Sequence, residues 1–209
     1  MPERINKLLF IRFSSIGDIV LTTPLLRAVK QSMPETEIHY VTKKGYAELL
    51  EPNPNIDRLH LLEDDFQELA TRLKAEEYDH IVDLHNSLRS RRLKMALRKP
   101  STTFPKLNFR KWLLTRWGID KLPRVHIVDR YFEALKPIGV VADDGGLEFY
   151  VPNGKRFNLQ ELPDSHRSSP VAVTIGAKQI GKQFSEAKLV SVLSQIEGPI
   201  VLLGGENEH

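Results

Sequence analysis

The chain has 209 residues, of which 41% are hydrophobic and none is cysteine, and it carries a formal net charge of +3. This composition is sufficient for a buried core, excludes disulfides and thiolate metal sites, and leaves no run of the ~18 apolar residues that span a membrane. The chain enters a predicted strand almost at once and shows no signal-peptide pattern, so we expect a cytoplasmic location.

The charged residues are unevenly distributed. No acidic residue occurs between Asp83 and Asp120, an interval that contributes +10 and leaves −7 for the remainder. Such asymmetry favours an anionic partner: a phosphorylated or carboxylated substrate, an anionic membrane surface or a nucleic acid. A solvated basic face is the simpler alternative. The basic residues are Arg89, Arg91, Arg92, Lys94, Arg98, Lys99, Lys106, Arg110, Lys111 and Arg116.

The first predicted strand–loop–helix unit covers residues 7–30. An apolar run at residues 8–13 predicts a buried strand, and the turn S-S-I-G separates it from Asp18 and a predicted helix. The glycine-rich fingerprints of dinucleotide-binding and P-loop proteins do not occur here. Asp18 has two interpretations. It caps the helix, or it is a general base in a ligand cleft, favoured as the anion by the helix dipole.

Further strands and helices alternate along the chain to residue 151. Pro24 either begins a new helix behind Thr23 or kinks one that began at Asp18. The alternation predicts an α/β fold with a Rossmann-like parallel sheet, whose right-handed crossovers place the strand-to-helix loops at one edge, where ligands bind. Strands are predicted at residues 37–42, 56–62, 78–84, 101–104 and 147–151, and helices at 45–50, 64–77, 89–98, 108–117 and 126–135.

A second loop, at residues 84–92, leads into a basic helix. Arginine at a helix N-terminus opposes the helix dipole, but guanidinium groups and backbone amides together bind phosphate or carboxylate. We therefore predict that Arg89 and Arg92 bind an anion. We expect His85 to form hydrogen bonds within the loop rather than to act as a catalyst.

The helix predicted at residues 108–117 is both basic and aromatic. Such a helix can lie on a membrane surface, with apolar side chains inserted and basic side chains against lipid phosphates. Alternatively, Trp112 and Leu113 pack inward and the charges face water.

A polar stretch rich in proline and serine separates two predicted domains. Residues 1–152 form the first domain, 153–169 the linker and 170–209 the start of the second. The second contains one strand–helix–strand unit, with strands at 170–175 and 199–203. Because one such unit cannot close a core, we expect the chain to end within this domain and to be inactive on its own.

The stretch R-F-S-S-I-G-D-I-V-L-T-T-P-L-L-R-A, residues 12–28, resembles the N-terminal signature of the ADP-heptose:lipopolysaccharide heptosyltransferase family of bacterial glycosyltransferases. The likeness lies in the Ser-Ser-x-Gly-Asp turn, the following Thr-x-Pro-Leu-Leu and the basic residue before the serines. It implies a GT-B fold, in which two Rossmann-like domains face each other across a cleft, and Asp18 as the base of an inverting transfer. The segment D-L-H-N-S-L-R-S is similar to the family's acceptor side, which binds an anionic lipid-linked sugar. The acceptor-binding residues are then Ser14, Ser15, Gly17, Arg89 and Arg92.

The last part of the chain resembles the start of the family's donor domain. Lys182-Gln183-Phe184 is similar to its Lys-x-Trp element, with phenylalanine in place of tryptophan. The resemblance implies an ADP-sugar donor, no cofactor, no required metal, and a peripheral location at the cytoplasmic face of the inner membrane. The donor-binding residues that it implies are Lys178, Gln179, Lys182, Gly205 and Glu206. The alternatives are a nucleic-acid-binding module that uses residues 84–119 and a non-catalytic sugar-nucleotide-binding module.

Overall fold

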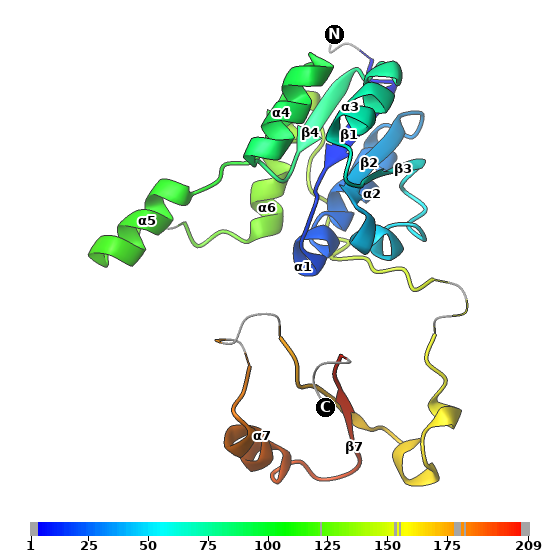
Figure 1. Cartoon of the computed structure of the whole chain (residues 1–209), viewed down its shortest axis with the longest axis vertical. Helices are drawn as coiled ribbons and strands as arrows, with labels where there is room; N and C mark the ends of the chain where they lie inside the picture. Colours follow the sequence, from blue (N-terminus) through cyan, green and yellow to red (C-terminus); the bar gives the residue numbers. More distant parts are fainter. Residues whose placement is uncertain are drawn as a thin grey trace. The chain divides into compact units, whose positions relative to one another are not determined.

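The computed structural model of the chain divides into two compact units, Met1–Lys155 and Arg156–His209, each described here by itself (Figure 1). The structure describes residues 4–121, 123–152, 154, 156–177, 181 and 183–205, without the side chains of residues 108–111.

The first unit is built on a parallel sheet of five strands in the order β3-β2-β1-β4-β5. The central strand β1 is fully buried from Leu8 to Ile11, because helices cover both faces of the sheet. This confirms the predicted α/β fold with a parallel sheet. The strands are β1 Lys7–Ile11, β2 Glu37–Lys43, β3 Arg58–Leu62, β4 His80–Asp83 and β5 Ser101–Thr103.

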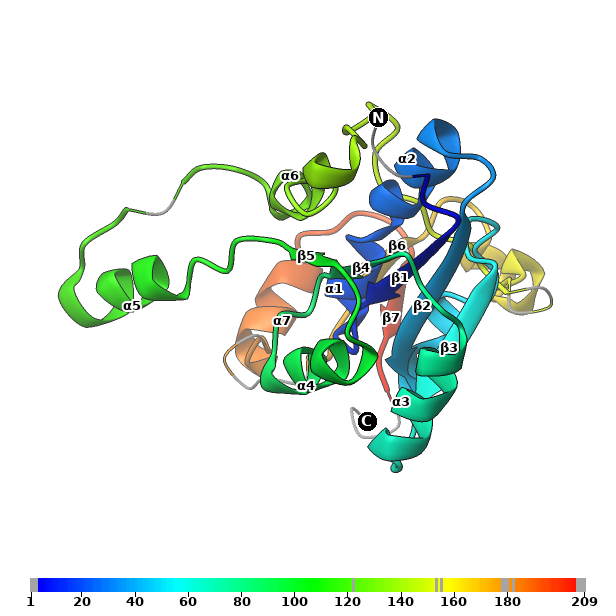
Figure 2. The ribbon, with the colours of Figure 1, turned by 90° about the horizontal axis from the view of Figure 1, so that it is seen from above.

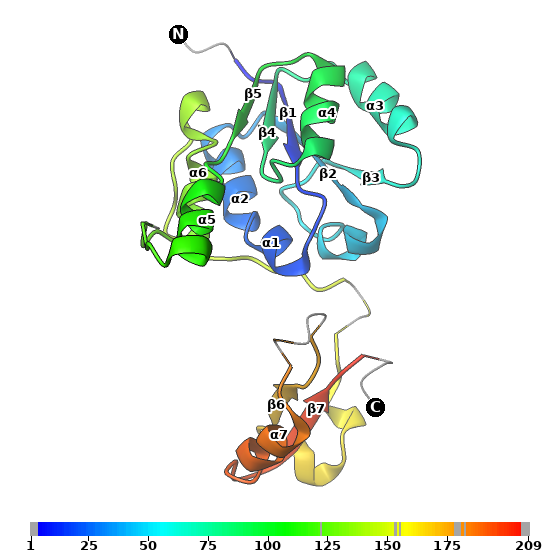
Figure 3. The ribbon, with the colours of Figure 1, turned by 60° about the vertical axis from the view of Figure 1, so that its left-hand side comes forward.

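Two hydrophobic clusters lie on opposite faces of the sheet. Successive side chains of a strand point to opposite faces, so Leu8 and Phe10 belong to one cluster and Leu9 and Ile11 to the other. The first cluster packs under α2 (Thr23–Ser32) and α6 (Ile127–Phe132), and the second under α3 (Phe66–Ala75) and α4 (Leu88–Leu97). Figures 2 and 3 show these two helical layers with the sheet between them.

The first predicted helix is two helices, α1 (Ile16–Val20) and α2. Thr22 is the N-cap of α2, and Pro24 lies in its first turn, where its missing N–H costs nothing. The hydroxyls of Thr22 and Thr23 donate to the carbonyls of Ile19 at 2.7 Å and Val20 at 2.8 Å, which satisfies the end of α1. A new helix at Pro24 was therefore the correct alternative, with its cap one residue earlier than expected.

The prediction of a strand at residues 147–151 was wrong. This segment forms no strand, because side-chain contacts with α2 hold it away from a sheet edge. Arg27 donates to Asp143 at 2.7 and 2.6 Å and pairs with Glu148 at 3.0 Å, while the Glu148 amide donates to the Thr23 hydroxyl at 3.0 Å. The alternating apolar pattern had suggested ladder hydrogen bonds, but the segment is held by ion pairs instead. The segment predicted as a helix at 45–50 is the 3₁₀-helix η1 (Lys44–Leu49).

Helix α5 (Asn108–Trp117) exposes large aromatic side chains. Trp112 is 49% exposed and Trp117 65% exposed, so the structure does not support inward packing of Trp112. Gly118 ends the helix in the left-handed conformation, with φ at 67°. In the part of the chain that the structure describes, no helix combines the length and the apolar content that crossing a bilayer requires.

The second unit contains two parallel strands, β6 (Val171–Thr174) and β7 (Ile200–Leu203), joined through α7 (Glu186–Leu193). The predicted strand–helix–strand unit is therefore confirmed. None of the described residues of this unit is buried, as expected of two strands and one helix, which cannot enclose a core. Two short 3₁₀-helices, η3 (Leu159–Glu161) and η4 (Asp164–His166), precede β6, and η2 (Lys136–Ile138) lies in the first unit.

Candidate functional site

Two loops meet at the carboxyl edge of the sheet. The first loop, residues 14–18, follows β1, and the second loop, residues 84–92, follows β4. Because Ile11 is paired with Asp83 in the parallel register, the two strands end at the same level. The Leu84 amide donates to the Ile11 carbonyl at 3.0 Å. The structure thus places both predicted loops side by side at the edge where α/β proteins bind ligands.

Arg12 ties the first loop to the second. Its side chain is only 9% exposed and its Nη1 donates to the Leu84 carbonyl at 2.5 Å. Its Nε donates to the Ser14 carbonyl at 2.7 Å, and its Nη2 pairs with Asp18 Oδ2 at 2.5 Å. One buried guanidinium therefore fixes the backbone of both loops and the carboxylate of Asp18.

Asp18 is the third residue of α1 and faces back toward its N-cap, Ser15. The Ser15 hydroxyl donates to Asp18 Oδ2 at 2.9 Å and the Ser15 amide at 3.4 Å, the arrangement of a capping box. The N-cap is therefore Ser15 and not Asp18, and Asp18 supports the cap from the third helical position. Its side chain remains 38% exposed, so it is also a carboxylate within reach of a ligand.

The surroundings of Asp18 keep it ionised. Partial burial by itself raises the pKa of Asp18, but the Ser15 hydrogen bonds and the Arg12 charge outweigh burial and lower the pKa below its usual value. At neutral pH the side chain is an anion that can accept a proton. Beside the loop, a Cβ added at Gly17 would meet no described atom within 4 Å, so there is open space next to Asp18.

Tyr131 of α6 belongs to this site, although the sequence gave no reason to assign it chemistry. The ring is 1% exposed and its centroid lies 5.9 Å from the Arg12 guanidinium carbon. Burial raises the pKa of Tyr131, and the negative charge of Asp18 raises it further. No local pattern could have identified this residue, because α6 is distant in the sequence from the first loop.

The second loop is shaped by a buried carboxylate. Asp83 is fully buried, pairs with Lys94 at 3.0 Å, and accepts hydrogen bonds from the amides of His85 at 3.0 Å and Asn86 at 2.7 Å. The His85 ring packs edge-on against Phe13, with centroids 5.1 Å apart. Burial, together with the nearby Arg12 charge, lowers the pKa of His85 to about 4, so the ring is neutral at physiological pH.

The two arginines predicted to bind an anion have different surroundings. Arg89 lines a surface pocket of about 510 Å³ together with Lys43 and Lys44. The guanidinium carbon of Arg92 lies 5.2 Å from the ring centroid of Phe66, on α3. Glu63 and Asp64 line the same pocket, and Glu63 pairs with Lys44 at 3.1 Å, so Arg89 lies in a pocket of mixed charge. Arg92 is directed toward α3. Their role in acceptor binding stays a prediction.

Most of the predicted donor-binding residues fall outside the described part of the chain. This is true of Lys178, Gln179, Lys182 and Glu206. Gly205 is described and lies exposed, directly after β7 and Gly204. Their role in donor binding likewise stays a prediction.

Comparison with solved structures defines the class of fold. The glycosyl transferase family 9 protein of Veillonella parvula aligns with all of this chain and 72% of its own, with a TM-score of 0.71 and 21% identity. The Escherichia coli heptosyltransferase WaaC, solved with ADP-2-deoxy-2-fluoro heptose, aligns with 97% of this chain and 70% of its own, with a TM-score of 0.66 and 18% identity. At these identities the likeness shows the fold, which is that of the GT-B heptosyltransferases.

Residues 66–209 match the family model described as Glycosyltransferase family 9 (heptosyltransferase). This match covers more than half of the chain, and the chain belongs to that family. Lipopolysaccharide heptosyltransferase 3 of Escherichia coli is 23% identical over 92% of this chain and 62% of its own length. Lipopolysaccharide heptosyltransferase 1 of Pseudomonas aeruginosa is 23% identical over 87% of this chain and 55% of its own length. The chain thus spans about 55–62% of these two relatives.

Proposed function

We propose that the protein is an inverting glycosyltransferase that transfers a sugar, heptose in the first instance, from an ADP-sugar to an anionic lipopolysaccharide-core acceptor. The observation that carries this proposal is the state of Asp18, which is ionised, partly exposed and fixed by Arg12 and Ser15 where two sheet loops meet. The names of the relatives support the substrate class.

In the proposed reaction, Asp18 accepts the proton of an acceptor hydroxyl as the hydroxyl oxygen attacks the anomeric carbon of the donor. The new glycosidic bond forms on one face of the sugar while the bond to the diphosphate breaks on the other. The configuration inverts and ADP leaves with the electron pair. Lys182 is our candidate for the group that neutralises the departing charge.

The stretch between Asp83 and Asp120 carries basic residues and no acidic one, which suits an anionic lipid-linked sugar. Arg89 of this stretch lines a pocket together with Lys43 and Lys44, and also with Glu63 and Asp64. Exposed Trp112 and Trp117 on α5, in a stretch without acidic residues, would contact lipid, so we propose peripheral association with the cytoplasmic face of the inner membrane. The proposed reaction requires no cofactor and no metal ion.

The test is to incubate the full-length protein with ADP-heptose and a lipopolysaccharide core that lacks the acceptor heptose. We expect the acceptor mass to increase by one heptosyl unit, with the anomeric configuration opposite to that of the donor in the NMR spectrum. Saturable ADP-heptose binding without any transfer would instead identify a sugar-nucleotide-binding module and contradict the proposal.

A further inference from the structure

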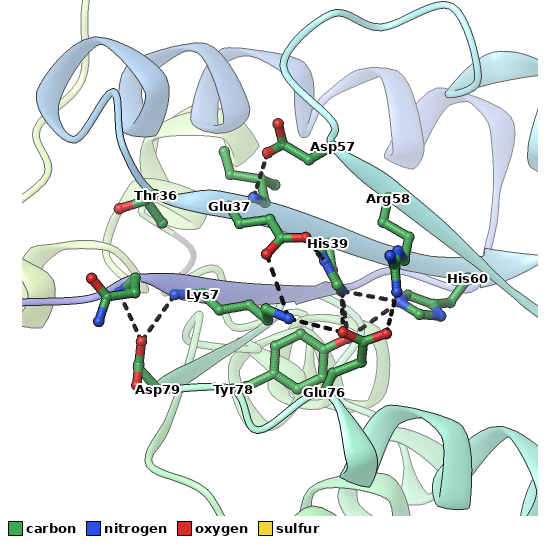
Figure 4. Close-up of polar contacts among 12 residues, drawn as sticks. Lys7, Thr36, Glu37, His39, Asp57, Arg58, His60, Glu76, Tyr78 and Asp79 are labelled. Carbon is green, nitrogen blue, oxygen red and sulfur yellow. Dashed lines mark hydrogen bonds and ion pairs between the residues drawn. The ribbon is translucent and has the colours of Figure 1, made fainter.

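A second polar cluster lies on one face of the sheet of the first unit, with side chains from β2, β3 and the segment before β4 (Figure 4). His39 of β2 and His60 of β3 point into it from the sheet face that α3 covers, and Glu76 and Tyr78 enter from the connection between α3 and β4. His39 is fully buried and His60 is 9% exposed. The cluster therefore joins two strands to a segment that follows a helix, within the first unit.

The nitrogens of the two imidazole rings converge. His39 Nδ1 and His60 Nε2 are 3.1 Å apart, and Glu76 Oε2 is 4.0 Å from His39 Nδ1. One ligand atom of each of the three residues lies within 4.8 Å of the other two. Tetrahedral zinc bonds of about 2.0–2.1 Å place ligand atoms about 3.4 Å apart. The two nitrogens already have nearly this spacing, and Glu76 reaches it with a movement of about 1 Å.

The tautomer of His39 suits a metal ligand. Its Nε2 contacts Glu37 Oε1 at 2.7 Å, so the proton belongs on Nε2 and the lone pair of Nδ1 faces the cluster. A carboxylate behind a ligating histidine is the usual outer partner in metal sites.

We propose that His39 Nδ1, His60 Nε2 and a carboxylate oxygen of Glu76 bind one divalent transition-metal ion of the zinc type. Two imidazoles and one carboxylate favour such an ion over magnesium or calcium, which prefer oxygen ligands. The ion would fasten β2 and β3 to the α3–β4 connection. Glu76 and Tyr78 precede β4, whereas the first loop follows the neighbouring parallel strand β1, so the cluster is separate from Asp18. Its role would be structural, and the proposal does not depend on the transferase function.

Lys7 would compete with the metal ion for the carboxylate of Glu76. Its ammonium contacts Glu76 Oε2 at 2.9 Å and Glu37 Oε2 at 3.4 Å. The ion has to displace Lys7 from Glu76, while Arg58 can keep its contact with the other oxygen, at 2.5 Å. Removing the ammonium should therefore strengthen metal binding, an effect opposite in sign to removing a ligand.

A purely hydrogen-bonded network is the competing explanation. The Tyr78 hydroxyl lies 2.8 Å from His39 Nδ1 and 3.2 Å from His60 Nε2. His60 can donate to Tyr78, Tyr78 to His39 and His39 to Glu37, so that every group is satisfied without an ion. Such a network has no affinity for metal ions, and binding measurements separate the two explanations.

The test is calorimetric titration of the chelator-treated full chain with Zn²⁺, together with Co²⁺ as a spectroscopic probe. We expect one ion per chain, the visible absorption of tetrahedral Co²⁺, and a rise of the melting temperature by about 5–10 °C at 100 times the dissociation constant. His60→Asn should weaken binding at least about tenfold, and Lys7→Met should strengthen it by about tenfold. The matched control is His80→Asn, because His80 bonds to Thr102 outside the cluster.

Failure to find saturable one-to-one binding in the wild-type chain would overturn the proposal. Equal losses of metal affinity in His60→Asn and His80→Asn would also overturn it, because they would indicate binding at scattered surface sites. If His60→Asn does not fold, Glu76→Gln and Lys7→Met still decide, because the site requires them to change the affinity in opposite directions.

Discussion

Arg12 offers the sharpest test of how the candidate site is held together. Arg12→Gln removes a guanidinium that donates to two backbone carbonyls and pairs with Asp18. Hydrogen bonds from a charged donor contribute about 1.5–3 kcal/mol each, and the two carbonyl bonds come from a side chain only 9% exposed. We discount the Asp18 contact for solvent screening, because that carboxylate is 38% exposed. The expected loss in the free energy of unfolding is about 3 kcal/mol.

The assay is urea unfolding followed by far-UV circular dichroism. The urea concentration at the midpoint of unfolding should fall by about 1–2 M. The dependence of the unfolding free energy on urea concentration should not change. The matched control is Arg91→Gln, since Arg91 is exposed on α4 and its guanidinium donates a long hydrogen bond, of 3.5 Å, to Asn86. A loss for Arg12→Gln no greater than that of Arg91→Gln would refute the view that Arg12 joins the two loops.

The pH dependence of this loss follows from the Asp18 carboxylate. Its pKa is lowered in the folded state, so it stabilises the fold above the unfolded value of about 3.9, and this contribution is lost as pH falls through the folded pKa. The part of the stability loss in Arg12→Gln that comes from the Asp18 ion pair should therefore become smaller below about pH 4. In a transfer assay, Arg12→Gln should move the acid limb of the rate profile to higher pH.

Three further outcomes are expected. The folded pKa of His85 is about 4, against about 6.5 when unfolded, so stability should fall as pH drops between these values. His85→Gln should make the stability less dependent on pH in urea titrations. Lys94→Met leaves the buried Asp83 carboxylate unpaired and should cost about 3 kcal/mol in the same measurement. Replacing Trp112 and Trp117 by serine should weaken binding to anionic vesicles about tenfold; retention on nucleic acid instead of vesicles would contradict the membrane proposal.

The sequence predicted the elements of the first unit because their signals are local. The apolar run of β1, the turn before Asp18 and the basic start of α4 can each be identified within a few residues. The prediction of a strand at residues 147–151 was wrong because this segment contacts side chains of α2. No pattern within the segment itself reveals those partners. An apolar alternation predicts a strand only where a sheet edge is available.

The parts of the site that escaped prediction depend on contacts between distant residues. Arg12 belongs to the sequence signature, but the signature does not reveal that its side chain reaches the Leu84 carbonyl beyond the neighbouring strand β4. Tyr131 comes from α6. The cluster of His39, His60 and Glu76 likewise needs the parallel register to bring β2 and β3 together. Sequence reasoning found the loop and its carboxylate, whereas the groups that tune that carboxylate required the fold.

The most direct test of the proposed mechanism is the rate of ADP release by Asp18→Asn in the full-length protein, compared with Asp144→Asn, which removes a charge from an exposed position of the same unit. We predict that Asp18→Asn lowers kcat by at least about 100-fold, equivalent to about 2.7 kcal/mol, with the donor KM and the fold unchanged. Asp144→Asn should retain full activity. Wild-type turnover by a folded Asp18→Asn variant would contradict the assignment of Asp18 as the base.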